Sequence, residues 1–110
     1  MSEADTQWGA RLKQARVAAG LSQKALGIAA GIDEFVASTR INRYELGVHK
    51  PDLLTVRKLA AVLDVPVAFF YADVDDEIAV LLLRYRRASE EARARAREAL
   101  EWTEPPSGRS

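Results

Sequence analysis

The sequence contains no cysteine and only 1 histidine, so it offers neither a disulfide framework nor a thiolate metal site. It also lacks an excess of charge, because 16 Lys and Arg residues balance 16 Asp and Glu residues. The excess of basic residues typical of nucleic-acid-binding domains is therefore absent. Evidence for a nucleic-acid partner must come from where individual polar and basic residues lie. No run approaches the roughly 18 apolar residues that span a bilayer, and no signal sequence opens the chain. We expect a cytoplasmic protein without a membrane segment.

Catalytic and metal-binding patterns are also missing. His49 lies in an expected loop without a serine or carboxylate pattern that would mark it as a base. Acidic residues gather before the last third of the chain, but their spacing does not fit a calcium loop, and carboxylates that open a helix are explained by its dipole; they are Asp73, Asp75, Asp76 and Glu77. We expect no catalytic residue, no metal and no cofactor, and an enzyme is the least favoured class.

Apolar residues at helical spacing predict an all-α body of five helices, assigned to residues 6–72 of the 110-residue chain. Asp5 or Thr6 is the expected cap of the first helix, and Gly20 its end. Ser22 and Asp52 are expected to cap later helices. Gly27 falls inside a helix, where glycine costs about 1 kcal/mol relative to alanine, so close approach of another backbone is predicted there.

The segment from residue 22 to residue 47 predicts two helices joined by a glycine turn. Its middle is ambiguous: one continuous helix can start at Asp33, or a separate short turn can precede a helix capped by Ser38. In a continuous helix Phe35 and Val36 would point away from the apolar face, which favours the separate turn.

The second helix of this pair presents polar side chains in a row, namely Ser38, Thr39, Arg40, Asn42 and Arg43. Short polar or forked side chains near a helix start suit base reading in a DNA groove, and each bidentate arginine–guanine contact is worth about 1–3 kcal/mol of discrimination. Gln23, at the start of the preceding helix, is placed to contact a phosphate. The alternative is that both arginines belong to a solvated helix face.

At these residues the chain resembles the Cro/repressor-type (XRE) helix-turn-helix domain of phage repressors and bacterial regulators. The resemblance covers residues 8–71 and rests on three stretches, LKQARVAAGLSQKALGIAAG, STRINRYELG and KPDLLTVRKLAAVLDVPVAFFY. It implies a five-helix lambda-repressor-like fold that binds double-stranded DNA.

The resemblance implies roles by position. Base contacts fall on Ser38, Thr39, Arg40 and Arg43, with Asn42 as an alternate, and phosphate contacts fall on Gln23, His49 and Lys50. Arg16 and Glu45 match an internal ion pair, which implies a structural role. The chain departs from the usual pattern by four additional residues between Gly31 and Glu45. Four residues are close to one helical turn, so the reading face can keep its phase.

The C-terminal part, residues 75–102, is expected to form a helical extension, and residues 103–110 a disordered tail. Apolar positions Ile78, Leu81, Leu82 and Tyr85 make a stripe that needs a partner surface, either a second chain or the body of its own domain. Repressors of this type bind as dimers to half-sites about 34 Å apart, which favours a dimer interface.

Together these patterns predict a homodimeric, sequence-specific transcriptional regulator from a bacterium or phage, with repression favoured over activation and a palindromic operator as its target. One alternative is the antitoxin of a toxin–antitoxin pair, whose C-terminal part binds a protein partner. Another is an interaction module that kept the fold and lost DNA binding, for which the zero net charge is the supporting feature.

Overall fold

The computed structural model describes residues 2–72, 76–101 and 103–105. Within them the chain is all-helical, without a strand. The helices are α1 (Glu3–Ala18), α2 (Gln23–Ala29), α3 (Ala37–Glu45), α4 (Leu53–Leu63), α5 (Val67–Tyr71), α6 (Asp76–Arg87) and α7 (Glu90–Ala99). Predictions that concern Asp73, Asp75, Trp102 and residues 106–110 lie outside the described residues.

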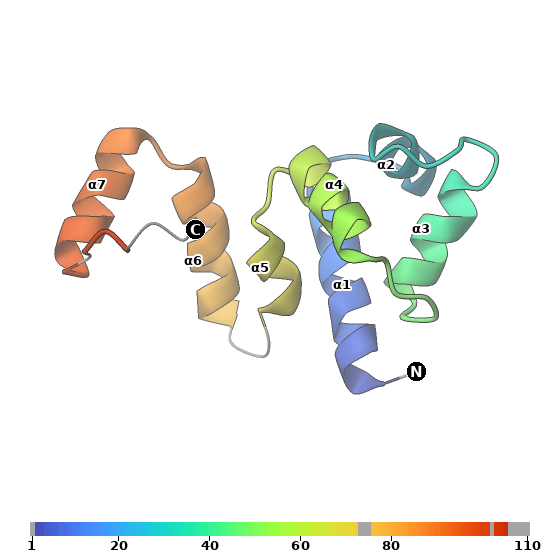
Figure 1. The fold of residues 1–110 in the computed structure, drawn as a ribbon, viewed down its shortest axis with the longest axis horizontal. Coiled ribbons are helices and arrows are strands. Elements are labelled where there is room, and N and C mark those ends of the chain that lie inside the picture. Colours follow the sequence, from blue (N-terminus) through green and yellow to red (C-terminus); the bar gives the residue numbers. More distant parts are fainter. Residues whose placement is uncertain (1, 73–75, 102, 106–110) are drawn as a thin grey trace.

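The first five helices enclose one apolar core. Its largest fully buried side chains include Leu12 of α1, Leu26 of α2, Ile41 of α3, Leu59 of α4 and Phe69 of α5. In Figure 1, α2 and α3 lie on one side of α1, and α5, α6 and α7 extend to the other side. The body therefore holds α3 at one end of the molecule and the C-terminal helices at the opposite end.

The caps of the helices follow the sequence signals in most places. Ser22 Oγ accepts the Ala25 N–H at 2.9 Å, Asp52 Oδ1 accepts the Thr55 N–H at 2.8 Å, and Gly20 has a φ of 72° after α1. The prediction that Asp5 or Thr6 caps α1 is wrong. Ser2 is the cap, because its hydroxyl accepts the Asp5 N–H while the Asp5 carboxylate accepts the Ser2 N–H, so the helix starts earlier.

The break between α2 and α3 is confirmed, since a turn precedes a separate helix that begins at Ala37. The expected cap of that helix is wrong: Ser38 lies in its first turn, and the cap position belongs to Val36, which makes no side-chain hydrogen bond. Ala37 is fully buried and Gly27 faces it; a Cβ on Gly27 would lie 2.7 Å from the Ala37 Cβ. The buried Ala37 therefore sets where α3 starts, and the close approach predicted at Gly27 is confirmed.

A second close approach occurs at Gly9 in α1, where sequence reasoning gave no signal. A Cβ there would lie 2.2 Å from the Glu45 carbonyl oxygen and 2.6 Å from the Tyr44 carbonyl oxygen. The end of α3 thus packs directly on the backbone of α1, and only glycine leaves the space.

We expect Gly9→Ala to destabilise the protein, although alanine is favoured over glycine inside a helix by about 1 kcal/mol. The clash is with backbone oxygens, which can yield only if α1 and α3 separate. Urea unfolding followed by circular dichroism should show a lower midpoint for Gly9→Ala. Ala10→Gly, an exposed neighbour in the same helix, should lose no more than the intrinsic helix preference. A midpoint raised by Gly9→Ala would contradict the packing described here.

The α6 helix divides its apolar residues between two directions. Ala79 is buried, and Leu82 and Leu83 pack against the core of the body, whereas Ile78 and Leu81 are exposed. The end of the helix is tied to α4 by the Arg86–Asp64 ion pair at 3.0 Å and by a hydrogen bond from Arg87 to the Leu63 carbonyl at 3.3 Å. One face of α6 therefore packs on the body of its own domain, and the other face is exposed to solvent.

The α7 helix, which Ser89 caps, folds back beside α6. Arg97 donates to the Tyr85 hydroxyl at 2.6 Å and forms an ion pair with Glu90 at 2.7 Å. The Arg97–Tyr85 bond joins α7 to α6, as does a hydrogen bond from Arg93 to the Arg86 carbonyl at 3.1 Å. The Glu90–Arg97 pair lies within α7, none of whose residues is buried.

Candidate nucleic-acid interface

The α3 helix separates its side chains cleanly into two groups. Ala37, Ile41 and Tyr44 are buried in the body. The polar residues predicted from the sequence are all exposed on the other side; they are Ser38, Thr39, Arg40, Asn42 and Arg43. Because the buried positions repeat at three- and four-residue intervals, the helix has one fixed orientation and its polar face points to solvent.

Part of this exposed face lines a hollow of about 890 Å³. Thr39, Arg40 and Arg43 of α3 line it together with His49 and Lys50 from the loop after α3. Five of the residues assigned to DNA contacts thus meet at one depression, with two guanidinium groups among them.

Ser38 and Asn42 are absent from the walls of this hollow, and the Asn42 side chain turns toward α2. The Gln23 side-chain amide donates one hydrogen bond to Asn42 Oδ1 and another to Glu45 Oε1, both at 3.1 Å. An amide nitrogen carries two hydrogens, so both donors are engaged within the protein. Gln23 can therefore offer a phosphate its backbone N–H, which as the first of α2 has no helical partner, or must give up one of these bonds.

Glu45 joins this network to α1. Its carboxylate accepts from Arg16 Nε at 2.6 Å and from Arg16 Nη2 at 3.1 Å, and Arg16 Nη1 donates to the Leu21 carbonyl at 3.0 Å. The Glu45 side chain is 4% exposed and that of Arg16 is 13% exposed. Arg16 and Glu45 thus make the ion pair that the resemblance implies, and the pair fixes the end of α3 against the scaffold.

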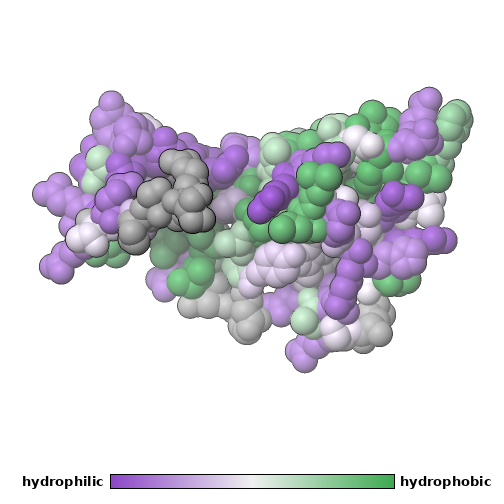
Figure 2. All heavy atoms as spheres, in the orientation of Figure 1, coloured by the Kyte–Doolittle hydropathy of each residue, from purple (hydrophilic) through white to green (hydrophobic). Residues whose placement is uncertain are grey.

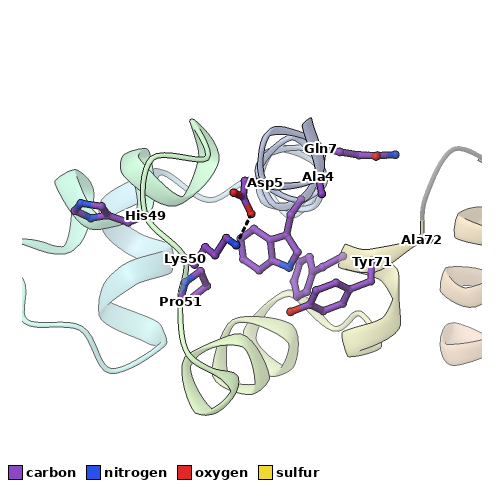
Figure 3. Close-up of a pocket in the computed structure, with 10 residues that line it drawn as sticks. Ala4, Asp5, Gln7, His49, Lys50, Pro51, Tyr71 and Ala72 are labelled. Carbon is purple, nitrogen blue, oxygen red and sulfur yellow. Dashed lines mark ion pairs between the residues drawn. The ribbon is translucent and has the colours of Figure 1, made fainter. Parts of the chain in front are cut away.

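The loop wall of the hollow is held by an ion pair that the sequence did not suggest. Lys50 Nζ lies 3.1 Å from Asp5 Oδ1, and Figure 3 shows the two side chains facing each other across the gap between the loop and α1. His49 lies apart from this pair in the same view. Of the two side chains assigned to phosphate on this loop, Lys50 is thus already partnered.

The Asp5 carboxylate is held in its charged form. Its side-chain hydrogen bond with Ser2 and then its bond with Lys50 lower the pKa of Asp5 below the ordinary value of 3.8. The pair borders a second hollow of about 400 Å³, whose aromatic wall consists of Trp8, Phe70 and Tyr71. The Trp8 and Phe70 ring centroids are 5.1 Å apart. This aromatic cluster fixes the start of α1, and with it the carboxylate that holds Lys50.

No helix among the described residues is long and apolar enough to cross a membrane, and these residues contain no group of three or more His, Cys, Asp or Glu side chains that could hold a metal ion.

The helix pair, the polar face of α3 and the buried ion pair define a helix-turn-helix DNA-binding domain. Residues 12–70 match the helix-turn-helix family, more than half of the chain, and the chain belongs to the XRE-type branch of this family of DNA-binding transcriptional regulators.

The similar proteins are regulators by name. The crystal structure of transcriptional regulator BswR superposes with a TM-score of 0.79 at 44% sequence identity, covering 84% of this chain and 91% of that one. Uncharacterized HTH-type transcriptional regulators from Sinorhizobium medicae and Rhizobium meliloti are each 32% identical over 69 residues, 63% of this chain. The match spans about half, 47%, of the length of these two curated relatives.

Proposed function

We propose that this chain is a sequence-specific transcriptional repressor that binds a palindromic operator as a homodimer. The observation that carries the proposal is the exposed polar face of α3, whose arginines share a hollow with the His49–Lys50 loop. A duplex that presents its major groove to this face would meet the proposed base-reading side chains and the proposed phosphate-binding groups in the same hollow.

The proposed reading follows from the chemistry of the side chains. Arg40 and Arg43 each present a forked donor that fits guanine O6 and N7. Asn42 is already oriented, because Gln23 donates to its Oδ1, which leaves the Asn42 NH₂ group to donate to a base. Ser38 and Thr39, in the first turn of α3, supply short hydroxyls near the base edges.

The proposed division of labour places DNA binding in residues 6–72 and dimerisation in residues 75–102, with residues 103–110 as a tail. The supporting feature of the second unit is the outward face of α6, where Ile78, Leu81 and Tyr85 are exposed. Leu82, which was grouped with them from the sequence, packs on the core and is left out of the proposed interface. A cytoplasmic location in a bacterium or phage host accompanies this function.

We expect Arg43→Ala to weaken binding to the preferred operator by about 30-fold or more, because a homodimer loses one contact in each half-site, and to relax the preference at one base pair of each half-site. The preferred site would be obtained by selection from random duplex DNA, and affinities measured by fluorescence anisotropy at fixed salt. Arg40→Ala should behave in the same way at a different base pair.

Arg95→Ala is the matched control, because it removes an exposed arginine of α7 far along the chain from α3. It should leave both affinity and preference unchanged. Equal losses on all sequences for Arg43→Ala would reassign Arg43 to a phosphate contact, and an unchanged preference would reject the base-reading role.

A further inference from the structure

The turn that separates α2 from α3 has a defined shape. Asp33 Oδ2 accepts the Phe35 N–H at 3.0 Å, and the Asp33 carbonyl accepts the Val36 N–H at 3.1 Å. The Val36 carbonyl then accepts the Arg40 N–H at 2.9 Å, which joins the turn to the first turn of α3. Side chains on this turn are therefore held in a fixed relation to the reading helix.

The turn presents two neighbouring apolar side chains to solvent. Phe35 is 87% exposed and Val36 is 41% exposed. Figure 1 shows the segment between α2 and α3 projecting beyond both helices, and Figure 2 shows apolar surface over α2 and this segment. A phenylalanine with almost no contact to its own protein contributes little to the fold, so this pair of neighbouring apolar side chains is available for contact with a partner.

The position of Val36 connects this tip to the proposed DNA surface. Val36 lines the same hollow as Thr39, Arg40 and Arg43, and it precedes Arg40 by one helical turn. The N-terminal residues of a recognition helix are the ones that contact base edges. The apolar tip is therefore continuous with the base-reading side chains and stands at the end of α3 that reaches base edges.

We propose that Val36 and Phe35 read thymine by packing against its C5-methyl group in the major groove. This inference rests on the proposed DNA-binding function. The thymine methyl is the one apolar group that the base edges present there, and valine and phenylalanine have no side-chain donor or acceptor for the others.

The test removes a single methyl group from the DNA. In the selected operator, each thymine of a half-site is replaced in turn by deoxyuracil, which keeps the base pair and loses only the methyl. Wild-type protein should lose about fourfold in affinity at one or two thymines, the worth of one buried methyl group. Val36→Ala and Phe35→Ala should bind the thymine operator more weakly and should no longer distinguish thymine from deoxyuracil at those positions.

Val17→Ala is the matched control, since Val17 is an exposed valine of α1. It should retain the full thymine preference. Arg43→Ala should also keep the preference for thymine over deoxyuracil, while it loses the preference at the base pair that Arg43 contacts. A failure of this inference is therefore distinguishable from a failure of the proposed DNA binding.

The inference is overturned if wild type discriminates at no thymine, or if both variants keep the discrimination. Phe35→Ala decides the matter if Val36→Ala proves unstable by thermal melting, because so exposed a side chain is dispensable for folding. Loss of binding to an unrelated protein, with thymine discrimination intact, would assign the tip to a protein partner and reject it as a reader of DNA.

Discussion

Replacing Glu45 with alanine is expected to lower the free energy of unfolding by about 3–5 kcal/mol, a large share of what a domain of this size has. The substitution removes the acceptor of two Arg16 bonds and one Gln23 bond. The Arg16 guanidinium would then remain largely buried without a countercharge, and that penalty exceeds the value of the contacts themselves. Urea unfolding, with midpoint and slope fitted together, measures the loss.

Two comparisons make this result interpretable. Arg86→Ala breaks the exposed Arg86–Asp64 pair and should cost less than about 1 kcal/mol, because solvent screens such a pair. The double variant Arg16→Met with Glu45→Leu removes both charges and should recover much of the stability lost by Glu45→Ala. A loss for Glu45→Ala no larger than for Arg86→Ala would show that the pair does not hold α3 in place.

Leu81→Asp is expected to convert the proposed dimer into a monomer and to reduce operator affinity by about 100-fold or more, since two linked half-site contacts become one. Leu81 is 56% exposed on the outward face of α6. A carboxylate there would have to be buried in the proposed interface between chains, which disfavours the dimer, but it would not disturb the core. Sedimentation velocity gives the mass, and the operator used for Arg43→Ala gives the affinity.

Val80→Asp is the control on the same helix, because Val80 is also exposed but points away from the face formed by Ile78, Leu81 and Tyr85. It should remain a dimer. An unchanged mass for Leu81→Asp would reject the proposed interface. A wild-type monomer that co-purifies with an unrelated small protein, and loses it on Leu81→Asp, would support the antitoxin alternative.

The elements with local signals could be predicted from the sequence. Helix caps are one such element, because a short polar side chain accepts a hydrogen bond from the amide three residues ahead, as at Ser22, Asp52 and Ser89. This spacing can be recognised in the sequence alone. The polar face of α3 could also be predicted, because helical periodicity assigns each residue to one side of the helix.

Features that depend on distant residues were not predictable. Gly9 contacts a backbone that lies far along the chain, and a glycine inside a helix carries no mark of its partner. Asp5 pairs with Lys50 only because α1 and the loop after α3 pass each other. The stripe on α6 was visible, but its division between core and solvent depends on the tilt of the helix against α5, which periodicity alone does not fix.

The Asp5–Lys50 pair changes how DNA binding should respond to salt. A lysine that contacts phosphate normally displaces cations condensed on the duplex, which gives a slope of about −0.9 per contact in log affinity against log salt. In the DNA-free protein Lys50 already has a countercharge, because it forms an ion pair with the Asp5 carboxylate. If the proposed phosphate contact replaces Asp5 at Lys50, salt weakens the ion pair that is lost as well as the contact that is gained, so this contact adds less than a full unit to the slope. The protein should therefore keep its hold on an operator over a wider range of ionic strength than its number of phosphate contacts suggests.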